Sequence, residues 1–247
     1  MMKLTKDVIQ WIRDYFKDNL NGKIICGVSG GKDSTIVAAL CVEALGTDRV
    51  IGVLMPNGRQ SDIDDSYRVC NHLHITHHTV NVGEAYDDLL NELFDTVPGA
   101  YPEPDAIKTN LPSRLRMATL YSVAALYPNS RVVNTSNWSE RYIGYSTKYG
   151  DGAGDFSPLG NLTVREVLAI GDDLGLPYDL VHKTPADGMS GKSDEEKIGF
   201  TYEELDNYLL IENKTASREV LAKITKMHEA NKHKLLPMPM FNPNEEE

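Results

Sequence analysis

The sequence predicts an α/β protein built on a parallel sheet, and three observations lead to this prediction. Residues 23–28 form a short apolar run rich in β-branched side chains, which is typical of a buried parallel strand. A glycine turn joins this run to an alanine- and leucine-rich segment over 34–45 that ends at Gly46, as a helix with a C-cap would. Strand and helix patterns then alternate as far as residue 97, and a βαβαβ order predicts parallel strands with right-handed crossovers.

The other expected helices and strands follow from the spacing of apolar residues along the chain. Further strands are expected over residues 49–55, 75–82 and 131–134. Apolar residues at helical spacing predict helices over residues 4–20, 61–73, 83–97, 110–127, 163–174, 202–210 and 217–232. The helix over 163–174 has a capping-box signature, because Thr163 is followed at the N3 position by Glu166. Residues 98–106 are expected to be a proline-rich loop, and the polar, glycine-containing segment 183–197 a mobile excursion.

Composition limits the classes of function. The chain has 247 residues, of which 41% are hydrophobic, and this suits a single sizeable domain. Its formal net charge of −11 argues against a general nucleic-acid-binding or membrane-binding surface. Cys26, Cys41 and Cys70 lie in expected strands or helices without paired spacing, and no apolar run approaches membrane-spanning length. We therefore expect a cytoplasmic protein whose cysteines are reduced core residues.

The turn after the first strand has the composition of an anion-binding site. Its sequence is Ser29-Gly30-Gly31-Lys32-Asp33-Ser34, between a strand and a helix N-terminus. Backbone N–H groups and the helix dipole favour a phosphate there, and the glycines let it approach closely. The spacing is not that of the P-loop of nucleotide triphosphatases. The alternative is a Gly-Gly turn that binds no ligand.

Later segments also carry polar side chains where a ligand is expected. Residues 135–140 follow the fourth expected strand, and parallel α/β sheets bind ligands beyond the carboxyl ends of their strands. Residues 145–155 contain too many glycines for a regular element and too many charged and hydroxyl groups for a spacer. Arg114 and Arg116 lie two positions apart on one expected helix, and therefore on different faces.

Together, these stretches resemble the ammonia-dependent NAD synthetases. The Ser-Gly-Gly-x-Asp-Ser pattern resembles the loop of the N-type ATP pyrophosphatases, and more specific pieces are Arg-x-Arg-Met within residues 110–117 and Thr-Lys-Tyr-Gly-Asp-Gly-Ala over 147–153. The resemblance covers nearly the whole chain after the first helix. It implies the Rossmann-like fold of the adenine nucleotide alpha hydrolases, with residues 1–247 as one NAD synthetase domain and no glutaminase domain.

The resemblance also implies a two-step amidation that uses ATP, Mg²⁺ and ammonia. The carboxylate of nicotinic acid adenine dinucleotide (deamido-NAD) attacks the α-phosphorus of ATP, and pyrophosphate leaves. Ammonia then attacks the mixed anhydride to give NAD and AMP. Because the first step brings two anions together, it needs charge neutralisation and alignment more than an acid or a base. A homodimer is implied as well.

By resemblance, Asp33 and Glu140 are the metal ligands, and the catalytic residues are these two with Lys148 and Asp155. The residues implied for ATP are Gly27, Ser29, Gly30, Gly31, Asp33, Ser34, Arg116, Thr135, Arg165 and Lys192. Those implied for deamido-NAD are Arg114, Lys148, Asp151 and Asp155. Two alternatives stay open. One of the two arginines is a structural ion-pair partner instead of a substrate contact, or Asp151 is a plain turn former.

The chain departs from the family where a lysine commonly reaches an ATP phosphate, because this position is Val164. An outer phosphate without a cation would be costly in a closed site. The candidate replacements are Arg165, Lys183 and Lys192. We expect residues 183–197 to form a lid over bound ATP that delivers Lys192 to the pyrophosphate.

Two rival functions remain. One is another N-type ATP pyrophosphatase, similar to the synthetase part of GMP synthetase or to a tRNA-modifying enzyme. The acidic balance and unpaired cysteines disfavour the tRNA enzyme. The other is a non-catalytic nucleotide-binding module, which would need the phosphate loop but neither Glu140 nor the segment 148–155.

Overall fold

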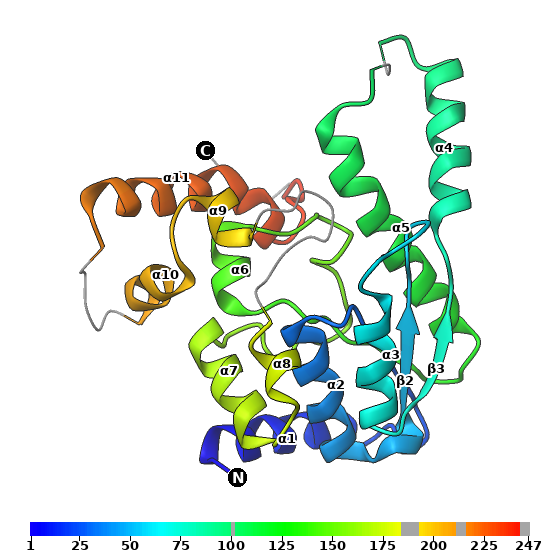
Figure 1. The fold of residues 1–247 in the computed structure, drawn as a ribbon, viewed down its shortest axis with the longest axis vertical. Helices are drawn as coiled ribbons and strands as arrows, with labels where there is room; N and C mark the ends of the chain where they lie inside the picture. Colours follow the sequence, from blue (N-terminus) through cyan, green and yellow to red (C-terminus); the bar gives the residue numbers. More distant parts are fainter. Residues whose placement is uncertain (100–101, 184–192, 211–215, 243–247) are drawn as a thin grey trace.

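The computed structural model describes residues 1–99, 102–183, 193–210 and 216–242 (Figure 1). Within these residues the centre is a four-stranded sheet with the order β3-β2-β1-β4, and every pair of neighbouring strands is parallel. The strands are β1 Ile24–Gly27, β2 Val50–Leu54, β3 Thr76–Thr79 and β4 Arg131–Val132. The predicted parallel α/β architecture is confirmed.

Helices cover both faces of the sheet. On one face, α5 (Asp105–Ala125) places Met117, Leu120 and Val123 against Ile25 and other apolar side chains of β1, β2 and β4. On the other face lie α2 (Lys32–Leu45) and α3 (Ile63–His72). Outside α2 pack α1 (Lys3–Tyr15), α7 (Val164–Asp173) and α8 (Tyr178–Val181). This burial on both sides explains why α2 is apolar around most of its circumference.

A second group of helices packs beyond the carboxyl ends of the strands. It comprises α6 Trp138–Ile143, α9 Asp194–Ile198, α10 Tyr202–Leu209 and α11 Arg218–Leu235. Their apolar side chains form a separate core around Ile143, Leu205 and Ile224. Figure 1 shows α4 (Gly83–Thr96) rising beside the first part of α5, at some distance from this group. The described residues contain no helix that is long and apolar enough to cross a membrane.

The predicted elements are confirmed, with changes at several ends. The helix expected over 4–20 ends at Tyr15, because the chain then turns and Asn19 bonds Asn129 and Gly22. The long helix expected from residue 110 already begins at Asp105, so part of the expected loop is helical.

The segment expected to be a mobile excursion, residues 183–197, ends in a helix that the prediction did not include. Residues 194–198 form α9, which starts with a capping box between Ser193 and Glu196. This signal was present in the sequence as Ser-x-x-Glu. Residues 184–192, including Lys192, lie outside the described residues.

Candidate active site

The glycine-containing loop of residues 28–31 joins β1 to α2, as predicted, and we refer to it by the expected role as the phosphate loop. Its first residues continue the strand, since the Val28 N–H donates to the Val53 carbonyl at 3.0 Å. The Ser34 hydroxyl donates to the Gly31 carbonyl at 3.1 Å and lies 3.0 Å from the Ser29 hydroxyl oxygen. Gly31 is the N-cap of α2 and has no side chain to bond the first-turn N–H groups. The loop is therefore shaped by its own hydroxyls, and its helix N-terminus suits an anion.

Gly30 is required by the conformation of this loop. Its φ of +76° lies in the left-handed region, and a Cβ built on it would lie 2.8 Å from Asp65 Cβ and 2.9 Å from the Ser66 nitrogen. We expect Gly30→Ala to lower the free energy of unfolding by about 1–3 kcal/mol for the conformation alone, and further for the clash. Chemical denaturation measures this loss. The control is Gly175→Ala, with φ +69° and open space around the added Cβ. Equal losses in the two variants would contradict the clash.

The structure brings together the two predicted metal ligands. Asp33 lies in the first turn of α2 and Glu140 in α6, which begins with a capping box between Asn137 and Glu140. The Asn137 side-chain amide also donates to Asp33 Oδ1 at 3.1 Å, and the Asn137 backbone N–H donates to Glu140 Oε2 at 3.5 Å, so one residue contacts both carboxylates. Each carboxylate side chain is 17% exposed. They form a largely buried acidic pair beside the phosphate loop.

Lys32 belongs to this site, and sequence reasoning missed it. Its Nζ lies 2.5 Å from Asp33 Oδ2 and 3.7 Å from Glu140 Oε1, and its side chain is only 5% exposed. Lys32 occupies the variable position of the Ser-Gly-Gly-x-Asp-Ser pattern, which is why the motif did not single it out. The available signal was a lysine in the first turn of a helix whose central residues 36–42 are all apolar.

The electrostatics of the site favour an additional cation. Burial lowers the pKa of Lys32, but Asp33 and Glu140 outweigh it and raise the pKa, so the ammonium stays charged. Burial, followed by repulsion from Asp33, raises the pKa of Glu140 to about 8. One ammonium thus faces two carboxylates, so the site favours the arrival of further positive charge.

The donor set fits Mg²⁺, which binds through one or two carboxylates together with substrate phosphates. In the described residues, no cluster of three or more His, Cys, Asp and Glu side chains could hold a metal ion. The Asp33–Glu140 pair therefore needs phosphate oxygens to complete a coordination shell. The ammonium of Lys32 between them shows that this position accepts a cation.

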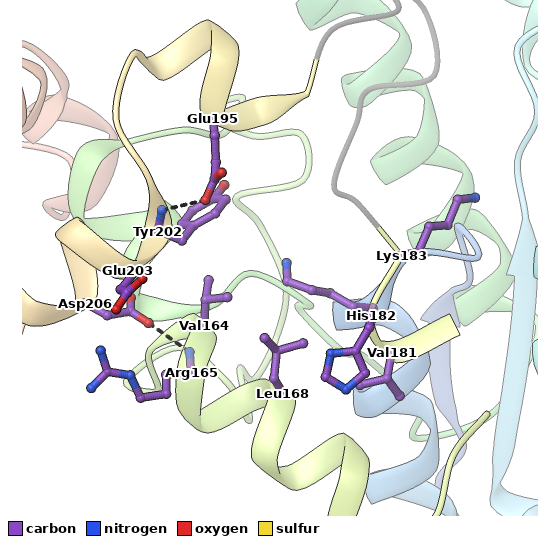
Figure 2. Close-up of a pocket in the computed structure, with 11 residues that line it drawn as sticks. Val164, Arg165, Leu168, Val181, His182, Lys183, Glu195, Tyr202, Glu203 and Asp206 are labelled. Carbon is purple, nitrogen blue, oxygen red and sulfur yellow. Dashed lines mark hydrogen bonds between the residues drawn. The ribbon is translucent and has the colours of Figure 1, made fainter. Parts of the chain in front are cut away.

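A pocket of about 430 Å³ opens beside Lys32. Figure 2 shows Val164 and Leu168 of α7 on one side of it, Tyr202 at the start of α10 on another, and Lys183 after α8. These walls are tied together by Asp206, which accepts from the Arg165 N–H at 2.8 Å and from the Ser139 hydroxyl. Burial raises the pKa of Asp206, and its hydrogen bonds oppose this shift.

Three side chains were candidates to supply the positive charge that Val164 lacks, and they lie in different positions. The exposed Arg165 side chain bonds Asn207 at 2.6 Å. Lys183 lies 2.7 Å from Asp65 and 3.6 Å from Asp62, so α3 already holds its ammonium. Lys192 is outside the described residues, and the proposed lid remains a prediction. By contrast, Lys32 lines the same pocket as Val164.

The arginines on α5 make different contacts, as their spacing predicted. Arg116 is half-buried and its Nε donates to the Met55 carbonyl, just after β2, at 2.9 Å. Arg114 is exposed and donates to the Lys148 carbonyl at 3.2 Å. Thr135 lies between β4 and α6, near the carboxyl end of the sheet. Contact of these residues with a substrate remains a prediction.

The predicted dinucleotide residues are engaged in contacts within the protein. Lys148 donates to the His233 carbonyl at 2.6 Å. The Asp151 carboxylate accepts from Ser113 and from the Thr147 N–H, which is the turn-forming alternative named above. Asp155 accepts from the Val132 N–H at 2.7 Å and from Tyr121. These contacts give all three side chains a structural role, and a role toward substrate remains a prediction.

Comparisons with known proteins identify relatives of this chain. A family model described as NAD synthase matches residues 4–238. The NH(3)-dependent NAD(+) synthetase of Carboxydothermus hydrogenoformans is 37% identical over 232 residues, which are 93% of each chain. That of Methanocaldococcus jannaschii is 36% identical over 91% of this chain and 86% of its own.

Solved structures with a similar fold were also found. The NMN synthetase from Francisella tularensis has a TM-score of 0.86 and 32% identity, and the match covers 98% of both chains. The NH3-dependent NAD synthetase from Campylobacter jejuni has a TM-score of 0.79 and 27% identity over 97% of this chain and 98% of its own. With a family model that spans nearly the whole sequence and relatives above 30% identity, the chain belongs to the NAD synthase family.

Proposed function

We propose that this protein amidates the carboxylate of deamido-NAD with ammonia, at the expense of ATP, to give NAD, AMP and pyrophosphate. The observation that carries this proposal is the buried pair of Asp33 and Glu140 at the N-terminus of α2, beside a loop built for phosphate. A carboxylate becomes a good acyl donor only when its oxygen leaves as part of AMP. The site supplies the charge balance that this activation needs.

Asp33 and Glu140 would hold Mg²⁺, whose chemistry is to neutralise the charge that develops on the phosphate oxygens. The loop N–H groups and the hydroxyls of Ser29 and Ser34 bind the phosphate chain and align the α-phosphorus. Asn137 keeps both carboxylates in position, through its side-chain amide to Asp33 and its backbone N–H to Glu140. In the second step ammonia attacks the acyl carbon, loses a proton, and AMP leaves.

Product analysis tests this function. With ATP, Mg²⁺, ammonium and deamido-NAD, we expect NAD, AMP and pyrophosphate in equal amounts. The loop pattern of the N-type ATP pyrophosphatases motivates this expectation. Stoichiometric ADP and phosphate would contradict it, and so would binding of ATP without turnover, which a nucleotide-binding module would show. Ammonia-free glutamine in place of ammonium should give no NAD.

A second candidate is the same amidation on a mononucleotide, giving NMN. The observation that favours it is the Francisella neighbour, whose structure is named as an NMN synthetase. Competition between deamido-NAD and the corresponding mononucleotide in one reaction decides between the two, because the preferred substrate is consumed first.

We also propose a cytoplasmic homodimer. Support for a subunit contact comes from two exposed aromatic side chains of α1: Trp11 and Tyr15 stack on each other, and Tyr15 also stacks on the buried Phe156. Trp11 is 45% exposed and Tyr15 is 42% exposed, and large aromatic side chains in such a position are typical of interfaces.

A further inference from the structure

The inward face of helix α11 changes from apolar to polar along its length. In its first half, Val220 and Ile224 pack into the core that α11 shares with α6 and α10. Further along, at spacings of three residues, come His228, Asn231 and Lys234, and all three are half-buried. Because residues three apart lie on one side of a helix, these side chains form a polar stripe that faces the protein.

The polar stripe binds carbonyl groups at the end of α6 and just after it. The bonds run from His228 Nδ1 to the Tyr142 carbonyl at 2.7 Å, from Asn231 Nδ2 to the Ile143 carbonyl at 2.9 Å, and from Lys234 Nζ to the Gly144 and Ser146 carbonyls at 2.8 and 2.9 Å. The last carbonyls of an α-helix have no partner within the helix, so they need donors from elsewhere. Figure 1 shows α11 lying across this end of α6.

Asn231 lies at the turn that ends α6. Gly144 has a φ of +65° there, and a Cβ built on it would lie 2.2 Å from Asn231 Cβ, so the backbone runs directly against this side chain. The Asn231 amide also donates to the Met227 carbonyl of its own helix at 2.9 Å, which fixes the orientation of the amide. Asn231 therefore sets both the position and the direction of the turn.

This turn separates two parts of the proposed active site. Before it, α6 carries Glu140, which a capping box holds in the first turn of the helix. After it, the loop 145–155 carries Lys148, whose Nζ returns to α11 and donates to the His233 carbonyl at 2.6 Å. Helix α11 thus holds both the start of the loop and a proposed substrate residue within it.

We propose that the polar stripe of α11, with Asn231 at its centre, positions the loop 145–155 for the dinucleotide substrate. The proposal rests on the proposed function, because it assigns this loop to deamido-NAD. Asn231 is a positioning residue, which acts through the turn at Gly144. Its loss should affect deamido-NAD much more than ATP, since Glu140 is held at the other end of α6 by a capping box.

Asn231→Leu tests this proposal, because leucine has a similar size and no donor. Amide hydrogen exchange, which needs no substrate, should become about tenfold faster or more over residues 145–155 and stay unchanged over residues 24–34. With deamido-NAD as the varied substrate, kcat/KM should fall about tenfold or more, because the groups on the loop lose their alignment. The KM for ATP should stay within about twofold, as for a substrate whose contacts are unchanged.

His228 allows a rescue experiment. Asparagine places an amide nitrogen near the position of the histidine Nδ1, so His228→Asn keeps a donor for the Tyr142 carbonyl and His228→Leu removes it. Both variants lose the stacking of the His228 and Tyr142 rings, whose centroids are 4.1 Å apart. His228→Leu should reproduce the effects of Asn231→Leu, whereas His228→Asn should keep kcat/KM for deamido-NAD within about threefold.

Ile224→Val is the matched control. Ile224 lies on the same face of α11 and is fully buried, and the loss of a methylene group there lowers stability without touching the carbonyl contacts. This variant should melt at a lower temperature, but its exchange over residues 145–155 and its kcat/KM for deamido-NAD should stay within about twofold.

Unchanged exchange over the loop in both leucine variants would overturn the proposal, and so would faster exchange with unchanged kinetics. Equal losses toward ATP and deamido-NAD, or the same losses in Ile224→Val, would also overturn it, because they indicate general destabilisation. If the unmodified protein forms no NAD, the proposed function fails, and the substrate assigned to the loop fails with it. The exchange rates then still decide whether Asn231 holds the loop.

Discussion

Asp33→Asn and Glu140→Gln should each lower the rate of adenylation by several orders of magnitude, roughly 10³-fold or more, in a protein that stays folded. Both substitutions keep the size of the side chain but remove an anionic group that we propose as a ligand of Mg²⁺. With one such ligand lost, the metal would be bound weakly or wrongly placed. The rate of AMP formation at saturating ATP and Mg²⁺ measures the effect, and thermal unfolding verifies the fold.

The matched control for these carboxylates is Glu43→Gln. Glu43 lies on α2 as Asp33 does, but its side chain is exposed. Its substitution should leave AMP formation within about twofold of the unmodified rate, as for an ordinary surface change. Near-normal turnover of Asp33→Asn or Glu140→Gln at saturating Mg²⁺ would show that the residue is not a ligand.

Lys32→Met should lower the free energy of unfolding by about 3–5 kcal/mol, the usual cost of breaking a buried ion pair by removal of one partner. Methionine fills a similar volume but leaves Asp33 and Glu140 facing each other without the ammonium. Chemical denaturation in the absence of metal measures the loss. Because the lysine no longer competes for the carboxylates, Mg²⁺ should raise the melting temperature of this variant more than that of the unmodified protein.

The control for this prediction is Lys108→Met on α5. Lys108 is 53% exposed and pairs with the fully exposed Asp105 at 3.5 Å. An exposed pair of this kind contributes little, so stability should change by less than about 0.5 kcal/mol. If Lys32→Met is as stable as this control, or does not respond to Mg²⁺, the ammonium does not balance the carboxylate pair.

Local signals in the sequence were sufficient to predict most of the fold. The apolar run before Ser29, the glycine turn and the alanine-rich segment after it correspond to β1, the loop and α2. The capping box of Thr163 and Glu166 likewise marks the start of α7. These features depend on neighbours within a few positions, and such interactions are visible in a sequence.

The parts that sequence reasoning missed depend on contacts between distant segments. Lys32 is notable only because folding places Glu140 beside it. The burial of the Tyr202 hydroxyl, which has no partner among the described residues, likewise results from the packing of α10 against other helices. The contact of Asp155 with the backbone of β4 was equally invisible, because the pairing of residues 155–156 with that strand is not encoded by any local pattern.

The strand order β3-β2-β1-β4 has a consequence for the position of the active site. Successive strands are added on one side of β1 as far as β3, and the chain then crosses to the opposite edge to form β4. Such a reversal creates a topological switch point between β1 and β4, where a crevice opens at the carboxyl ends of the strands. The loop that carries Asp33 follows β1, and the segment that carries Glu140 follows β4. The backbone topology therefore brings the two proposed metal ligands to one switch point, whatever the side chains around them.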